Sequence, residues 1–314
     1  MDDVRVFTGN AHPELAKAVC CQLGVPLGQA EVFQFSNENI FVRIQENIRE
    51  MDVFIVQPLA SPVNRSIMEL LIMIDAAKRA SARRITAVVP YYAYGRTDKK
   101  DQPRVPITGR LLADLITVAG AHRVLTMDLH AGQIQGFFNI PVDELTALYL
   151  LTDYFRAKEL SDLVVVATDI GIAKRARNVA ERLKAPLAIV EKRRLFNDGH
   201  TESLNVIGDV QGKTALTFDD EIDTAGSLVT AVQALKEHGA VRVYSCCTHP
   251  IFSGPAIERI AASSIEEVVV TDTVPVPPAK RVPKVTVLSV APLIAEAIRR
   301  IHGGQSVGAL FESR

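Results

Sequence analysis

Short apolar runs alternate with segments of helical periodicity along the whole chain. Each run covers four to six residues rich in valine, isoleucine and leucine. Runs of this kind, separated by amphipathic helices, are typical of parallel sheets that helices cover on both faces. The strands expected in the first half are 4–7, 32–35, 53–56, 85–89 and 124–127, and those in the second half are 163–167, 187–190, 215–218, 241–246, 267–270 and 285–288.

The two halves look like copies of one unit. When residues 4–27 are aligned without gaps to residues 164–187, eight of the 24 positions are identical. The identical positions fall in a strand, a helix and a turn, and a strand–loop–helix segment follows in both halves. A length of 314 residues also suits two domains. We therefore expect an α/β fold with two domains related by duplication, 1–146 and 147–314, each a mainly parallel sheet flanked by helices.

Composition and charge exclude several classes of function. Hydrophobic residues make up 48% of the chain, charged residues make up 23%, and the net charge is −1. No overall field therefore attracts nucleic acid or an anionic membrane, and the apolar runs are far shorter than the ~18 residues that a membrane span needs. The four cysteines form two adjacent pairs without zinc-ligand spacing, which favours a reducing compartment. We expect a cytoplasmic protein that binds neither nucleic acid nor membrane.

The segment 214–237 carries the clearest chemical signal. An apolar run leads into an acidic segment, residues 219–227, and an amphipathic helix pattern follows. Backbone N–H groups at a helix start suit a phosphate, and neighbouring carboxylates accept hydrogen bonds from vicinal hydroxyls. A phosphate and a diol together describe ribose 5-phosphate; the alternative is a solvated acidic turn. The candidate residues are Asp219, Asp220, Asp223, Thr224, Ala225, Gly226 and Ser227.

Two strand ends carry candidate metal ligands. The expected strand 124–127 is followed by Asp128 and His130, and period-two alternation would put both side chains on one face. Asp169 follows the apolar run that begins at residue 163. Carboxylates at two strand ends can hold a magnesium ion that keeps most of its waters, while His130 can instead bond a phosphate oxygen or a bound water. For Asp128 and His130 alone, a capped strand end is the alternative.

Two basic segments could hold phosphates. Lys192 and Arg194 open the stretch 192–204, which has no periodicity and is expected to be a long flexible loop. Cations on such a loop can neutralise charge that develops during phosphoryl transfer; a solvated basic turn is the alternative. Arg96 follows a tyrosine-rich stretch, 90–95, and aromatic rings beside cations could stack a base. A charged loop beside a partly buried tyrosine cluster explains that pattern equally well.

Longer stretches resemble one protein family over nearly the whole chain. The chain is similar to the ribose-phosphate pyrophosphokinases, also called phosphoribosyl-pyrophosphate synthetases, and many of the matches extend over ten or more residues. The stretches that carry the resemblance are 62–64, 68–96 (MELLIMIDAAKRASARRITAVVPYYAYGR), 105–116, 123–145 (RVLTMDLHAGQIQGFFNIPVDEL), 191–194, 207–213, 219–227 (DDEIDTAGS), 248–256 (THPIFSGPA) and 288–302.

The resemblance implies that both domains are phosphoribosyltransferase-like, and it implies a reaction and the residues that serve it. In this family the anomeric hydroxyl of ribose 5-phosphate attacks the β-phosphorus of ATP, the diphosphoryl group moves, AMP leaves and Mg2+ is required. The resemblance assigns catalysis to Lys192, Arg194 and His130, and it assigns ribose 5-phosphate binding to the acidic segment. His130, Asp169 and Asp128 correspond to the metal and triphosphate site. The implied ATP contacts are Phe35, Asn37, Asn39, Arg96, Thr97, Asp98 and His130.

The resemblance also implies an assembly. Active enzymes of this family are homo-oligomers, commonly hexamers built from dimers, in which residues 35–39 complete the ATP site of a neighbouring subunit. Three alternatives remain: a non-catalytic subunit that regulates a synthetase, a phosphoribosyltransferase that consumes the same product, and a ligand-sensing nucleic-acid-binding regulator. The retained His130, Lys192 and Arg194 argue against the first, although the segments 37–39 and 170–172, which differ from the family pattern, argue for it. The two-domain length argues against the second, and the neutral charge argues against the third.

Overall fold

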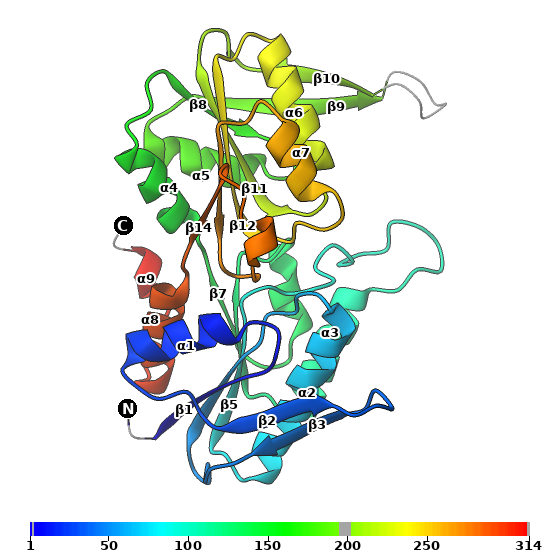
Figure 1. Ribbon diagram of the computed structural model, residues 1–314, viewed down its shortest axis with the longest axis vertical. Helices are drawn as coiled ribbons and strands as arrows, with labels where there is room; N and C mark the ends of the chain where they lie inside the picture. Colours follow the sequence, from blue (N-terminus) through cyan, green and yellow to red (C-terminus); the bar gives the residue numbers. More distant parts are fainter. Residues whose placement is uncertain (2, 195–201, 313–314) are drawn as a thin grey trace. The chain divides into compact units, whose positions relative to one another are not determined.

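A computed structural model describes residues 1, 3–194 and 202–312 and divides them into two compact units. The described residues of 1–146, 273–275 and 289–314 form the first unit, and those of 147–272 and 276–288 form the second. Each unit has its own sheet (Figure 1). None of the helices that the structure describes is long and apolar enough to cross a membrane.

The first unit is built on a five-stranded parallel sheet. Its strands follow the order β1 (Val4–Thr8), β4 (Asp52–Val56), β5 (Arg84–Val89), β6 (Arg123–Met127) and β7 (Val142–Leu145). Helices α2 (Val63–Arg79) and α3 (Thr108–Ala119) pack side by side, as do α1 (Pro13–Leu23) and α8 (Ala291–His302). Figure 1 shows the orange-red α8 beside the blue α1. Because helices cover the sheet, all five residues of β4 are buried, which explains its unbroken apolar run.

A separate hairpin lies on this unit. Strands β2 (Ala30–Gln34) and β3 (Ile40–Ile44) pair with each other in a two-stranded antiparallel sheet, the β2–β3 hairpin. One side of the hairpin packs on the core through Ala30, Val32, Val42 and Ile44. The rings of Phe33, Phe35 and Phe41 cluster at its tip, with centroids 5.0 to 5.9 Å apart.

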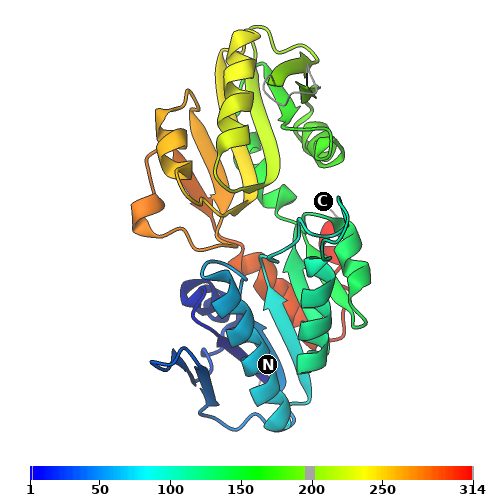
Figure 2. The same ribbon diagram turned by 90° about the vertical axis from the view of Figure 1, so that its right-hand side faces the viewer.

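The second unit repeats this plan with a larger sheet. Its order is β10 (Glu202–Ile207), β9 (Leu187–Arg194), β8 (Leu163–Ala167), β11 (Thr214–Ile222), β12 (Arg242–Pro250), β13 (Glu267–Thr271) and β14 (Val285–Leu288). All neighbours are parallel except β9 and β10. Helix α4 (Leu148–Ala157) packs on α5 (Ala173–Leu183), and Figure 2 shows α6 (Gly226–Glu237) beside α7 (Ala256–Ala262).

The strand orders confirm the internal duplication. The series β1, β4, β5, β6, β7 in the first unit matches β8, β11, β12, β13, β14 in the second, strand by strand. In both units a pair of strands, β2–β3 or β9–β10, is inserted after the helix that follows the first strand of this series, α1 or α5. The inserted pair joins the main sheet in the second unit and stays separate in the first. The expected α/β fold of two related, mainly parallel sheets is therefore confirmed.

Two expectations differ from the structure. The stretch 192–204 was expected to be a loop, but β9 extends to Arg194 and β10 begins at Glu202, so the backbone at both ends is paired strand; residues 195–201 lie outside the described part. The second domain was expected to run to residue 314, whereas residues 289–312 pack in the first unit. The physical reason is that α8 buries its apolar face against α1.

A buried carboxylate, paired with a partly exposed arginine, links α8 to the sheet of the first unit. Asp52 begins β4 and is fully buried, and its carboxylate accepts a hydrogen bond from the Arg84 guanidinium. Nδ1 of His302, the last residue of α8, lies 2.9 Å from the same carboxylate. A carboxylate without water depends on these partners for its charge.

We expect Asp52→Asn to lower the free energy of unfolding by about 1–3 kcal/mol, because the amide is uncharged and would place its NH2 group against one of the two Arg84 N–H groups that the carboxylate accepts. Urea unfolding of the full chain measures the change. The control is Asp75→Asn, which removes an exposed pair with Arg79 on α2 and should change stability by less than about 0.5 kcal/mol. Equal effects of the two substitutions would contradict the role of the buried carboxylate.

Candidate active site

The acidic segment connects β11 to α6, as the sequence predicted. Asp219 and Asp220 lie near the carboxyl end of β11, at the edge where ligands bind in parallel sheets. Thr168 Oγ1, at the end of β8, donates to Asp219 Oδ2 over 2.7 Å, and the backbone N–H of Asp220 donates to Asp219 Oδ1 over 2.9 Å. The two neighbouring strands therefore hold the Asp219 carboxylate in one orientation.

The rest of the acidic segment is fixed by the loop that follows β12. Ser253 Oγ donates to the Asp223 carboxylate, and its backbone N–H donates to the Asp223 carbonyl over 3.0 Å. Arg259 donates to the carbonyl of Thr224 over 2.9 Å. Ala225 adopts the left-handed conformation, with φ +58, and α6 starts at the next residue. The first-turn N–H groups of a helix have no partner within the helix, so this start suits an anion.

Burial dominates the electrostatics of this segment. Removal from water, together with the neighbouring Asp220, raises the pKa of Asp219 to about 8. A carboxyl group with this pKa is largely protonated at neutral pH, and it can then donate as well as accept a hydrogen bond.

Asp169 ends the neighbouring strand and closes its own loop. It follows Thr168 after β8 and is exposed, and its Oδ1 accepts a hydrogen bond of 3.0 Å from the backbone N–H of Ile172. The carboxylate thus shapes the turn into α5 and still faces solvent. Lys192 and Arg194 belong to β9, where their backbones pair with Leu204 and Glu202 of β10.

The structure corrects one expectation in the first unit. Asp128 and His130 were expected to share a strand face, but β6 ends at Met127 and Asp128 has a φ of +38. The alternation of side chains between two faces requires extended backbone. The positive φ of Asp128 interrupts the extended backbone, so the alternation cannot be used to place His130 on the same face as Asp128. Asp128 is only 8% exposed, whereas His130 is exposed.

The turn after β5 lies against His130. A Cβ atom placed on Gly95 would lie 3.4 Å from the Cβ of His130, so Arg96 follows a residue that lies close to the histidine. Gln133 donates to the Asp98 carboxylate, which ties this turn to the segment after His130. Thr97 Oγ1 donates to the Tyr94 carbonyl over 2.8 Å. The structure therefore brings the candidates 96–98 and His130 together.

The remaining ATP candidates form the tip of the β2–β3 hairpin. Phe35 N–H donates to the Asn39 carbonyl over 2.8 Å, and the Asn37 side chain accepts from Asn39 N–H over 3.2 Å. Glu38 has a φ of +68, which closes the turn. Phe35 is 47% exposed. The tip is an ordered turn that presents an aromatic ring and polar side chains to solvent.

The sequence analysis missed several supporting residues. Thr168 and Ser253 orient the two acidic residues Asp219 and Asp223, and Glu144 accepts from the backbone N–H of Leu129, beside His130, over 2.9 Å. Ser253 and Glu144 do lie in the stretches 248–256 and 123–145 that resemble the family. Their supporting roles became evident only from the fold, because each of these residues lies far in sequence from the residue that it bonds.

Comparisons with known proteins agree over the whole chain. The family model of the N-terminal domain of ribose phosphate pyrophosphokinase matches residues 4–120, and the model of the phosphoribosyl synthetase-associated domain matches residues 195–312. A ribose-phosphate pyrophosphokinase of Caldanaerobacter subterraneus subsp. tengcongensis is 56% identical over 311 residues, which cover 99% of this chain and 98% of that protein. That of Corynebacterium ammoniagenes is 53% identical over 309 residues, covering 98% and 97%.

A solved structure shows the same architecture. The crystal structure of phosphoribosylpyrophosphate synthetase from Mycobacterium smegmatis matches with a TM-score of 0.91 and 45% identity, covering 96% of this chain and 99% of that chain. Two related, mainly parallel sheets, the second of which leads into the acidic segment, define a two-domain α/β protein. Its architecture is that of the phosphoribosylpyrophosphate synthetases. The chain belongs to the ribose-phosphate pyrophosphokinase family.

The raised pKa of Asp219 predicts a pH dependence of stability. The folded protein keeps this proton up to about pH 8, whereas the unfolded chain releases it near the ordinary value of 3.8. Since the folded state binds more protons between these values, the stability contributed by Asp219 falls as the pH rises from about 4 to about 8.

Urea unfolding at about pH 5 and about pH 8 tests this dependence. The variant Asp219→Asn should lose less stability than the wild type between the two pH values, because its amide does not titrate. Glu237→Gln, at the exposed end of α6, is the control and should follow the wild type. If Asp219→Asn also follows the wild type, the carboxyl group does not titrate in this range.

Proposed function

We propose that the chain is a catalytically active ribose-phosphate diphosphokinase. It transfers the β,γ-diphosphoryl group of ATP to the anomeric hydroxyl of ribose 5-phosphate and releases phosphoribosyl pyrophosphate and AMP. The observation that carries the proposal is the acidic segment, in which Asp219 is oriented by Thr168 after β8 and Asp223 by Ser253 in the loop after β12, and which leads directly into a helix start. Identity of 56% to a pyrophosphokinase over nearly the full length supports the same activity.

The acidic segment binds ribose 5-phosphate in this proposal. Its carboxyl groups accept hydrogen bonds from the sugar hydroxyls, and the loop and helix start, from Asp223 to Ser227, hold the 5-phosphate through backbone N–H groups and the helix dipole. The proton held by Asp219 fits a site that takes up a sugar diol, since the group can both donate and accept.

ATP binds to the first unit and to a hairpin tip. Arg96, Thr97, Asp98 and His130 contact the nucleotide and its phosphates, and residues Phe35, Asn37 and Asn39 complete the site of a neighbouring subunit. The exposed aromatic cluster at the tip supports this assembly, because clustered exposed apolar side chains are typical of contact surfaces. We propose a homo-oligomer, a hexamer built from dimers, in the cytoplasm, where the four free thiols stay reduced.

Lys192 and Arg194 stabilise the charge that develops as the diphosphoryl group moves. His130 holds a phosphate oxygen at the same stage.

The donor set also suits Mg2+. Asp128 follows β6 in the first unit and Asp169 follows β8 in the second, and each carries carboxylate oxygens. Magnesium bound with nucleotides takes one or two carboxylates together with phosphate oxygens and waters, so each of the two residues is a candidate ligand in this proposal. When bound, the ion neutralises the triphosphate and orients it for in-line attack. His130 serves this site through the phosphates or a water, because imidazole is an unusual magnesium ligand.

Product analysis tests the activity. Purified full-length protein is incubated with ATP and Mg2+, with and without ribose 5-phosphate, and the nucleotides are separated. We expect AMP, in equal amount to phosphoribosyl pyrophosphate, only when the sugar is present. ADP as the nucleotide product would mean transfer of a single phosphoryl group. No turnover in any condition would support the regulatory-subunit alternative.

Removal of the side-chain charge of either Lys192 or Arg194 should slow the transfer of the diphosphoryl group. We expect Lys192→Ala and Arg194→Ala to lower kcat by about 10²–10³-fold, roughly 3–4 kcal/mol of barrier, as for other preorganised charge-stabilising groups. The neighbouring Arg193→Ala is the matched control, because it removes the same charge from the same strand. Turnover near that of the wild type in both variants, with normal thermal unfolding, would remove these residues from the mechanism.

Asp223→Asn should weaken the use of ribose 5-phosphate selectively. An amide loses one acceptor position for the sugar hydroxyls, and one hydrogen bond to a charged group is worth about 1.5–3 kcal/mol, so KM for ribose 5-phosphate should rise about 10–100-fold. KM for ATP should stay within about twofold. Asp209→Asn, in the exposed turn before β11, serves as the control. A similar rise of both KM values would show that the site is misassigned.

A further inference from the structure

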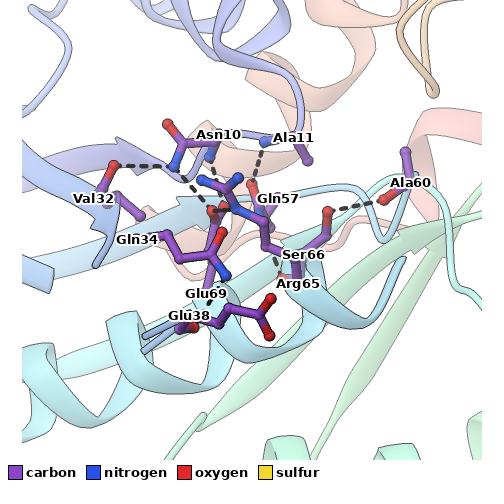
Figure 3. A network of polar contacts seen from close by, with 10 residues as sticks. All are labelled: Asn10, Ala11, Val32, Gln34, Glu38, Gln57, Ala60, Arg65, Ser66 and Glu69. Atoms are coloured by element: carbon purple, nitrogen blue, oxygen red, sulfur yellow. Dashed lines mark hydrogen bonds and ion pairs between the residues drawn. The ribbon is translucent and has the colours of Figure 1, made fainter. Parts of the chain in front are cut away.

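A buried carboxylate in the first unit has no role in the function described so far. Glu69 lies on α2, and its side chain is 2% exposed. It accepts four hydrogen bonds of 2.9 to 3.0 Å, from the backbone N–H and the side-chain amide of Asn10, from Gln57 Nε2 and from Arg65 Nε. Figure 3 shows these groups converging on the carboxylate from the loop after β1, the end of β4 and α2 itself.

The internal duplication shows that the fold does not require this carboxylate. The register of β1 on β4 and of β8 on β11 makes Asp52 equivalent to Ala215. The same offset relates Val63, the first residue of α2, to Gly226, the first residue of α6. It places the 1% exposed Val232 at the position of Glu69. An apolar side chain therefore completes the same helix–sheet contact in the second unit, where it is also cheaper to bury.

Asn10 connects the carboxylate to the β2–β3 hairpin. Its Nδ2 group donates one hydrogen bond to Glu69 Oε1 over 2.9 Å and another to the carbonyl of Val32 in β2 over 3.0 Å. An ionised carboxylate can only accept, so Glu69 forces the NH2 end of the Asn10 amide toward both acceptors. The opposite amide orientation would place two oxygens against each other at Val32.

Val32 lies close in sequence to the hairpin tip. Gln34 follows two residues later, and its Nε2 donates to the carbonyl of Glu38 over 3.0 Å, which braces the turn (Figure 3). The hairpin is not paired with the main sheet, so its strands lack the ladder that would otherwise fix them. Its base is held where Gly28 N–H donates to the Val6 carbonyl over 2.8 Å.

We propose that Glu69 is a positioning residue that, through Asn10, fixes the β2–β3 hairpin and so orients the tip residues Phe35, Asn37 and Asn39. In its catalytic consequence this rests on the proposed function, since the tip contributes to ATP binding there. Glu69 itself touches no substrate.

Amide hydrogen exchange on the ligand-free full chain tests the structural part. In Glu69→Val, which installs the residue of the second unit, and in Asn10→Ala, hairpin amides between residues 32 and 41 should exchange about tenfold faster than in the wild type. Amides of β4 and β5 should be unchanged. Arg65→Ala is the control, because it removes one partner and leaves the contacts of Glu69 with Asn10. Unchanged hairpin exchange in both variants overturns the proposal. If Glu69→Val also speeds exchange in β4, the substitution has disturbed the core, and the exchange of the hairpin amides in Asn10→Ala then tests the proposal alone.

Steady-state kinetics tests the catalytic part. KM for ATP should rise about tenfold in Glu69→Val and Asn10→Ala, while KM for ribose 5-phosphate and kcat stay within about twofold of the wild type. A parallel rise of both KM values, or no change in either, would contradict the claim that Glu69 orients the residues that contact ATP. A wild type without turnover would contradict the proposed function, and the exchange measurement would still decide whether Glu69 fixes the hairpin.

Discussion

Parallel strand pairing is the constraint on which the rest of this structure depends. Parallel strands need a crossover connection before the next strand begins, so all strands of one sheet end at the same edge and the loops that follow them collect there. In the second unit this constraint brings Asp169, after β8, to the same edge as the acidic segment after β11. In the first unit it does the same for the turns after β5 and β6, which carry Arg96 and His130.

The two units use the same edge in different ways. At the end of β11 the second unit keeps two neighbouring carboxyl groups, Asp219 and Asp220, and burial raises the pKa of Asp219. At the equivalent end of β4 the first unit has Gln57, whose side chain bonds Glu69 and the loop after β1. Internal side chains thus bond one another at this strand end of the first unit. In the proposed function the two units take different ligands: the second unit takes the pentose phosphate and the first takes the nucleotide.

Much of the fold follows from the sequence, because buried parallel strands must be apolar throughout. All eleven expected strands correspond to observed ones. Three observed strands were not expected: β3, β7 and β10. Strands β7, with the sequence VDEL, and β10 lie at sheet edges, where polar residues are tolerated. Strand β3, with the sequence IFVRI, was missed although it is mostly apolar. The acidic segment was recognisable because its carboxylates and the start of the following helix lie within nine consecutive residues, 219–227. The conformation of Asp128, the return of α8 to the first unit and the partners of Glu69 depend on contacts between distant segments, which periodicity does not report.

Hydrogen exchange on addition of ribose 5-phosphate tests the central claim, that only the second unit keeps a pentose-phosphate site. The account predicts protection of the backbone amides from Asp219 to Ser227, at the acidic segment and the start of α6. It predicts no protection of residues 57–64, the equivalent connection in the first unit. Protection of 57–64, or equal protection of both segments, would contradict the division of roles between the two units.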